Sequence, residues 1–415
     1  MNSIMKKSFP FHYSLLEYLF TLTGFFFFLL DVALDIWTVV SFYQNGDYVY
    51  MAVMIFLLLG SSVLLQVFSW LWYSDCPDKL ETKVETFANK HKLIKPLHFL
   101  QLGVFLRYAG VIEISTTLFF QQRRSTEGVA LYLNLDLQML RMFEAFSESA
   151  PQLILMMSRI LQRGGLELIT GLKILTSAVA IVFTIAFPIR TFVRAFLQEK
   201  FEMSWISTGV YFLCNLLLII PRVTALALFC SVLPWYLIAH FLSLWMLLVL
   251  GVWSQKTDYM KSPGWEWLFR ATIGLIWYFS WFKVSTGSIK LKNALYYGVM
   301  VLDTLMLLGF WCWKVFEYSG CWSSLNPYIV TPILLGLYVS GILLKIIYYR
   351  WLHPNLDEQK IHKTSEQQNI KQASAFYNMD SDFLESSSED TAAAPTQPVT
   401  GVLKRERAIT ADFSF

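Results

Sequence analysis

The chain has 415 residues, of which 55% are hydrophobic and only 15% are charged. Soluble domains carry about 25% charged residues, so this composition excludes a water-soluble globular protein. The charge is also unevenly distributed: residues 351–415 hold ten acidic and six basic residues, whereas residues 1–350 hold the remaining 20 acidic and 27 basic ones. The sequence therefore indicates a basic, membrane-embedded body followed by an acidic tail.

Motifs of enzymes, metal sites and nucleic-acid binders are missing. The five cysteines form no CxxC pair and no other metal-ligand spacing. Lysines and arginines are scattered between apolar runs, which argues against a nucleic-acid partner. Phosphate-binding glycine loops, nucleophile elbows and HExxH helices do not occur either. We therefore expect no cofactor, no metal, no nucleic acid and no enzyme activity.

Ten apolar stretches follow one another along the body. Each can supply the roughly 20 residues that cross a hydrocarbon core. Runs of this length form helices, because lipid offers the backbone no hydrogen-bond partner. The sequence thus predicts an all-α, polytopic membrane protein. The stretches are 14–43, 49–73, 97–120, 133–158, 169–188, 205–230, 233–253, 265–283, 294–316 and 327–350.

The placement of Lys and Arg predicts the orientation, because cytosolic connectors carry the excess of these residues. Connectors 44–48 and 317–326 contain neither residue, and we expect them outside the cell. Connector 74–96 contains five lysines, and we expect it in the cytosol.

Two of the ten stretches are better explained as re-entrant segments than as crossings. If 97–120 and 265–283 enter the membrane and return to the cytosolic side, the other basic connectors also become cytosolic. Only Arg159 and Arg163 then remain on the outer side. The prediction is eight crossings plus two re-entrant helices, with both termini in the cytosol.

The order of spans and re-entrant segments repeats once along the chain. A tandem order of this kind suits a membrane protein built from two related halves, here about 1–204 and 205–354, within one helical body, 1–354. Residues 355–415 are rich in Ser, Glu, Gln and Thr and lack apolar periodicity, which predicts a disordered cytosolic tail. A merely flexible tail and a regulatory one are both open.

We select nine ionisable residues inside the apolar stretches, because a charge near a helix centre costs about 2.5–3.5 kcal/mol. They are Asp31, Asp35, Arg107, Asp136, Arg141, Glu144, Glu148, Arg222 and Asp303. Asp31 and Asp35 lie four positions apart, so they project from one helix face. Arg141, Glu144 and Glu148 share a face at offsets of three and four.

These charges have two interpretations. They can form buried ion pairs that hold helices in register, although such pairs contribute little net stability. Alternatively they form a polar track across the bilayer on which a charged or zwitterionic group finds partners. The excess of carboxylates over arginines favours the track, and Asp31, Glu144, Glu148 and Arg222 are its strongest candidates.

Several sequence blocks resemble the XK-related family. They are Phe28–Trp37, Leu65–Trp72, Asp136–Leu153, Tyr211–Val223, Tyr278–Phe282 and Tyr348–Pro354. The resemblance covers the body from about 14 to 354 and leaves out the tail.

This resemblance implies a phospholipid scramblase of the plasma membrane. Such proteins let phosphatidylserine reach the outer leaflet of apoptotic cells as an engulfment signal, and they need no energy source. The resemblance also implies eight spans with two re-entrant helices and, in one branch of the family, a single-span immunoglobulin-type partner, basigin or neuroplastin. Activation by a caspase that removes part of the cytosolic tail is a further implication.

The tail fits caspase activation only in part, because it lacks an Asp-x-x-Asp site. Candidate cleavage residues are Asp380, Asp382 and Asp390, of which Asp380 and Asp390 precede a small residue. Activation by phosphorylation and constitutive activity stay open. Two other functions also remain: a solute transporter or ion channel that uses the same charges, and a protein that only chaperones another membrane protein.

Overall fold

The computed structural model of the chain describes twelve parts of the sequence. They are 15–75, 82–121, 127–163, 171–174, 176–178, 180–184, 205–255, 257, 260, 262–281, 290–317 and 325–352. The regular structure in these residues is helical throughout and includes no strand. The tail 355–415 lies outside the described residues, and so do Asp380, Asp382 and Asp390.

Seven helices in the described residues are long and apolar enough to cross a membrane. They are Thr21–Gln44, Tyr48–Ser74, Gly103–Phe120, Ile206–Val232, Pro234–Trp253, Lys292–Glu317 and Pro327–Trp351. This confirms an all-α, polytopic membrane protein. Of the other stretches, 169–188 is described only in part, as a shorter apolar helix between Gly171 and Thr184.

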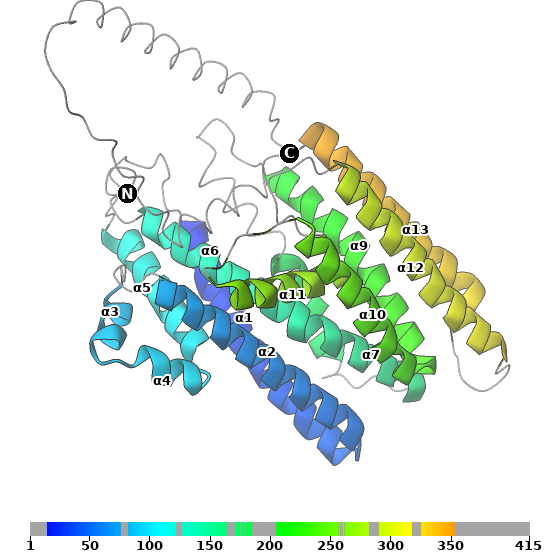
Figure 1. The fold of residues 1–415 in the computed structure, drawn as a ribbon, viewed down its shortest axis with the longest axis horizontal. Helices are drawn as coiled ribbons and strands as arrows, with labels where there is room; N and C mark the ends of the chain where they lie inside the picture. Colours follow the sequence, from blue (N-terminus) through cyan, green and yellow to red (C-terminus); the bar gives the residue numbers. More distant parts are fainter. Residues whose placement is uncertain are drawn as a thin grey trace, which may run out of the picture.

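Helices α1 (Leu15–Gln44) and α2 (Tyr48–Asp75) form an antiparallel hairpin (Figure 1). The turn between them contains Gly46 at a φ of 72°, a left-handed conformation that glycine adopts without steric cost. Beside α2 lie three further helices: α3 (Lys83–Lys90), α4 (Ile94–Phe99) and α5 (Gly103–Gln121).

The α3–α4–α5 segment runs along α2 away from its Asp75 end and then turns back toward that end. The backbone N–H of Gly103 donates to Gln66 Oε1 at 2.9 Å, and Gln66 lies about 13 Å along α2 before its end at Asp75. One turn later Arg107 Nε donates to Ser69 Oγ at 2.8 Å. Helix α5 therefore starts partway down α2 and runs back toward its Asp75 end, which agrees with the re-entrant segment predicted for 97–120.

The predicted stretch 133–158 is one continuous helical rod. It consists of α6 (Glu127–Glu144), the π-helical turn η2 (Ala145–Ser149) and α7 (Ala150–Arg163). A π-helical turn widens the helix locally and often marks a functional site.

Helix α9 (Trp205–Val232) lies at the centre of the remaining bundle. It packs against α7, α10 (Pro234–Trp253), α12 (Lys290–Glu317) and α13 (Pro327–Ile347). A last π-helical turn, η4 (Tyr348–Leu352), follows α13. Helix α11 (Pro263–Phe279) packs against α10 and lies across the middle of the molecule in Figure 1.

Candidate functional site

The aspartates of α1 share one basic partner. Lys173 Nζ lies 2.5 Å from Asp31 Oδ1 and 2.7 Å from Asp35 Oδ1. All three side chains are buried, so the spacing of four residues places both carboxylates on one face, as predicted. Lys173 lies in the stretch 169–188 and completes a network that the sequence analysis left without a base.

A third carboxylate joins this pair from η2. One ligand oxygen each of Asp31, Asp35 and Glu148 lies within 4.8 Å of the others, and all three residues are buried. Carboxylates in such proximity attract a cation or retain a proton, because like charges at short range cannot all stay ionised. The ammonium of Lys173 already lies against two of them.

The π-helical turn divides the charged face of the α6–α7 rod. Arg141 pairs with Glu144 at the end of α6, and its guanidinium also lies 5.2 Å from the centre of the Phe28 ring. Glu148, within the turn, faces the α1 aspartates instead. Among the described residues, the first network therefore contains Asp31, Asp35, Glu144 and Glu148 against Lys173 and Arg141, so its carboxylates outnumber its cations.

Arg107 serves a different role from the rest of the set. Its Nη1 lies 3.3 Å from Asp136 Oδ2, while Nε and Nη2 donate to the hydroxyl and carbonyl oxygens of Ser69. The guanidinium also lies 4.2 Å from the centre of the Tyr73 ring. Arg107 thus joins α5 to α2 and α6, as the ion-pair interpretation predicted for such residues.

A second network lies between α9, α10 and α12. Arg222 of α9, which is 1% exposed, pairs through Nη1 with Asp303 Oδ2. Asp303 Oδ1 lies 2.8 Å from His240 Nε2, and His240 Nδ1 lies 3.0 Å from the hydroxyl of Tyr278 on α11. Nη2 of Arg222 has no hydrogen-bond partner among the described residues.

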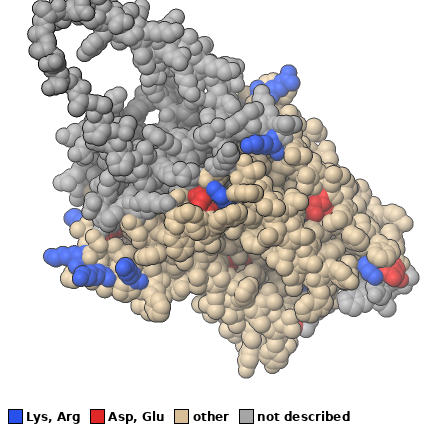
Figure 2. Space-filling view, viewed as in Figure 1, with Lys and Arg blue, Asp and Glu red and all other residues tan. Residues whose placement is uncertain are grey.

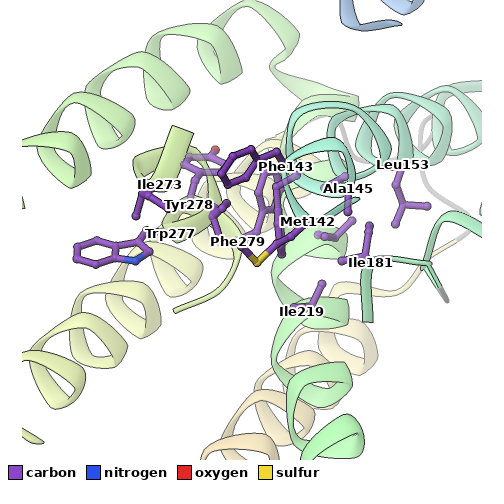
Figure 3. Close-up of a cluster of buried hydrophobic side chains, with 14 of the residues drawn as sticks. Met142, Phe143, Ala145, Leu153, Ile181, Ile219, Ile273, Trp277, Tyr278 and Phe279 are labelled. Carbon is purple, nitrogen blue, oxygen red and sulfur yellow. The ribbon is translucent and has the colours of Figure 1, made fainter. Parts of the chain in front are cut away.

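A cluster of buried hydrophobic side chains (Figure 3) contains residues that adjoin both networks. Phe143 and Ala145 flank Glu144 in sequence, and Tyr278 contacts the second network. The rings of Phe146 on η2 and Phe279 on α11 stack with centroids 5.9 Å apart. In the part of the chain that is described, seven of the nine predicted charges therefore belong to two polar groups, and Arg107 and Asp136 form a separate ion pair.

Gln152 adds an unpaired polar group near the first network. It follows Glu148 by four residues at the start of α7 and is fully buried. Neither polar atom of its amide has a hydrogen-bond partner among the described residues. An unpaired buried amide is destabilising, so this side chain is suited to a ligand that brings its own donors or acceptors.

Sequence reasoning missed two polar residues that complete these networks, Lys173 and His240. It also missed two buried residues with contacts elsewhere: Asp47 pairs with Arg159, and Lys345 donates to the hydroxyl of Tyr297. Lys173 and Lys345 interrupt apolar runs, so the sequence alone could have identified them as buried charges. His240 and Asp47 gave no such signal: the first is a lone histidine, and the second lies in a short polar connector.

Comparisons with known proteins agree with this architecture. A family model described as XK-related protein matches residues 19–354. A protein named XK-related protein 8 from Tetraodon nigroviridis is 38% identical over 85% of this chain and 87% of its own length. Proteins of the same name from Gasterosteus aculeatus and Pan troglodytes are each 36% identical, over 83% and 79% of this chain and 85% and 82% of their own lengths.

Proposed function

The chain belongs to the XK-related family, and on this premise we propose that it is a phospholipid scramblase of the plasma membrane. In this proposal it moves phosphatidylserine and other phospholipids between the two leaflets of apoptotic cells. The lipids move down their own gradient, so no energy source is needed.

The observation that carries the proposal is the excess of buried carboxylate in the first network. Asp31 and Asp35 share one ammonium, that of Lys173, while the neighbouring carboxylate of Glu148 has no basic partner among the described residues. The headgroup of phosphatidylserine carries an ammonium group beside its phosphate, so it can supply the missing positive charge. The unbonded Nη2 of Arg222 in the second network supplies a donor for the phosphate.

The proposed mechanism spares the headgroup the cost of crossing bare hydrocarbon. Charged faces of α1, η2, α9 and α12 offer the headgroup partners, while the acyl chains stay in lipid. Because the stacked rings of Phe146 and Phe279 belong to the buried cluster that adjoins both networks, these side chains must part before a headgroup passes. We assign the described conformation to the closed state.

Regulation and partners complete the proposal. The acidic tail holds the path closed until a caspase cuts it at Asp380, Asp382 or Asp390, and both termini lie in the cytosol. A single-span immunoglobulin-type partner such as basigin or neuroplastin accompanies the chain to the surface. Phosphorylation of the tail is the alternative switch.

A second function is favoured by the same three carboxylates. Oxygen atoms of three acids within 4.8 Å can also bind an inorganic cation, as in a channel or solute transporter. In that case Lys173 competes with the ion for Asp31 and Asp35.

Reconstituted vesicles separate these functions. The purified chain, intact or trimmed near residue 380, is placed in vesicles with a fluorescent phospholipid in both leaflets. A membrane-impermeant reductant is then added from outside. Scrambling lets the reductant bleach more than the outer half of the fluorescence, whereas a channel passes ions and leaves the inner half protected. A trimmed chain that moves neither lipid nor ions refutes both functions.

A further inference from the structure

The segment that enters beside α2 carries a basic, partly apolar surface that the charge networks do not use. Lys83, Lys90, Lys92 and Lys95 are exposed along α3 and α4. Figure 2 shows the corresponding cluster of Lys and Arg atoms at the left edge, where Figure 1 places these helices.

The same segment exposes large apolar side chains. Phe99 is 86% exposed, Leu100 63% and Phe87 59%. These residues follow or flank the lysines in sequence, so one short segment presents cationic and apolar groups together.

The acidic groups that the structure describes near this surface are already engaged. Glu85 is the only acidic residue between 82 and 102, and it is buried and accepts a hydrogen bond from the Tyr73 hydroxyl at 2.9 Å. Glu113 of α5 accepts bonds from the backbone N–H groups of Lys83 and Val84, both at 2.9 Å. Among the described residues the lysines of the segment have no acidic partner, so their charge is available to an anion.

Contacts with helix α2 give the depth of this segment below the end of the α2 span. Glu85 bonds to Tyr73, His98 Nε2 lies 2.9 Å from Ser69 Oγ, and Gln101 Oε1 lies 2.6 Å from Ser62 Oγ. The candidate span of α2 ends at Ser74. At 1.5 Å per residue, the chain descends from that end at Glu85 to about 18 Å inside it at Gln101.

By this measure, the lysines and the exposed apolar side chains lie at different depths. Lys90, Lys92 and Lys95 lie between Glu85 and His98 along the chain, within about 8 Å of the end of the span. Their long side chains can reach upward from there, which puts the ammonium groups at headgroup level. Phe99 and Leu100 lie deeper, at the level of the acyl chains.

We propose that residues 82–102 form a binding site for anionic phospholipids in the leaflet that the segment enters. The lysines bind the phosphate and carboxylate groups of the headgroup, and Phe99 and Leu100 pack against its acyl chains. The exposed apolar side chains favour lipid over a soluble anion or an acidic peptide, since neither of those would cover them. The site depends on the depth of the segment and not on transfer between leaflets.

Photolabelling of the full-length chain in nanodiscs tests this site. Phosphatidylserine with a photoreactive acyl chain is compared with the matching phosphatidylcholine in discs of identical bulk composition. The labelled peptides are then mapped by mass spectrometry. We expect phosphatidylserine to label peptides that contain Phe99 and Leu100 in excess, by about fivefold for each lysine engaged. Higher salt should reduce the excess.

Matched variants locate the charge that is responsible. The triple variant Lys90→Gln/Lys92→Gln/Lys95→Gln should abolish the excess. Lys314→Gln should leave it unchanged, since Lys314 pairs with Glu317 at the end of α12. Equal labelling by both lipids, an excess that survives the triple variant, or cross-links from these lysines to the acidic tail would overturn the site. Because labelling needs no scrambling, this result is independent of the vesicle assay.

Discussion

Arg159 and Asp47 form a buried ion pair between the end of the α1–α2 hairpin and α7. Arg159 Nε donates to Asp47 Oδ2 at 2.6 Å, and both residues are 5% exposed. The guanidinium also lies 5.3 Å from the centre of the Phe42 ring. Arg159 was one of two basic residues that the orientation argument left on the outer side. Its carboxylate partner compensates the charge that makes an outward arginine unfavourable.

Removing one member of this pair should be strongly destabilising. Asp47→Asn leaves a buried guanidinium without its anion, and the expected loss of stability is about 3–5 kcal/mol. Thermal unfolding of the detergent-solubilised chain measures it.

The double variant Asp47→Asn/Arg159→Gln provides the control. It removes both charges and should be more stable than either single variant. A loss in the double variant that equals the sum of the two single losses would show that the pair is not coupled.

Glu148→Gln distinguishes the lipid path from a structural clasp. No basic partner of Glu148 is present among the described residues, and the substitution removes one carboxyl group from a cluster of three. Thermal stability should therefore stay the same or rise. Lipid transfer by the trimmed chain should fall about tenfold or more, because a charge-assisted hydrogen bond to the headgroup is lost.

Glu317→Gln is the matched control for that substitution, because the Glu317 side chain is 48% exposed beside Lys314 at the end of α12. Glu317→Gln should change neither the thermal stability nor the lipid transfer of the trimmed chain. If Glu148→Gln unfolds the chain instead, Glu148 is a structural residue and the lipid path loses its main support.

Much of the helical architecture follows from hydrophobic length alone. The stretch 205–230 corresponds to α9 and 233–253 to α10, each within a few residues at its ends. The break within 97–120 was less accessible. The break depends on Gln101 at a φ of 64° and on the hydrogen bond from the Gly103 backbone N–H to Gln66. Neither feature can be predicted from apolar periodicity.

The candidate site was predictable as a set of residues but not as a set of contacts. The cost of burying charge identified Asp31, Asp35 and Glu148 in the sequence. Helical spacing grouped Glu148 with Arg141, but Glu148 lies in the π-helical turn η2 and faces α1 instead. Partners more than a hundred residues away, such as Lys173 for Asp31, depend on packing that a single sequence does not encode locally.

Gly274→Ala should separate α10 from α11. A Cβ at this position would lie 2.6 Å from Val249 Cγ2 and 3.3 Å from the Val249 backbone nitrogen. The expected loss of stability is about 1–3 kcal/mol, typical of overpacking. Thermal unfolding provides the measurement.

Two further variants test whether close packing causes the loss of stability in Gly274→Ala. Gly298→Ala on α12 has nothing within 4 Å of the new Cβ and should be neutral or slightly stabilising, since alanine favours helix over glycine. Adding Val249→Ala to Gly274→Ala should restore part of the loss. A stable Gly274→Ala variant would mean that α10 and α11 pack less closely than described.

Cysteine labelling in intact cells should reveal the orientation. Asn45 and Asn89 are exposed at opposite ends of α2, in the α1–α2 turn and in α3. A membrane-impermeant maleimide should label Asn45→Cys in intact cells, because its connector lacks Lys and Arg. It should label Asn89→Cys only after permeabilisation, because the neighbouring lysines favour the cytosol. The parent chain with its five native cysteines provides the background. The reverse pattern would invert the topology and place the acidic tail outside the cell, where no caspase could reach it.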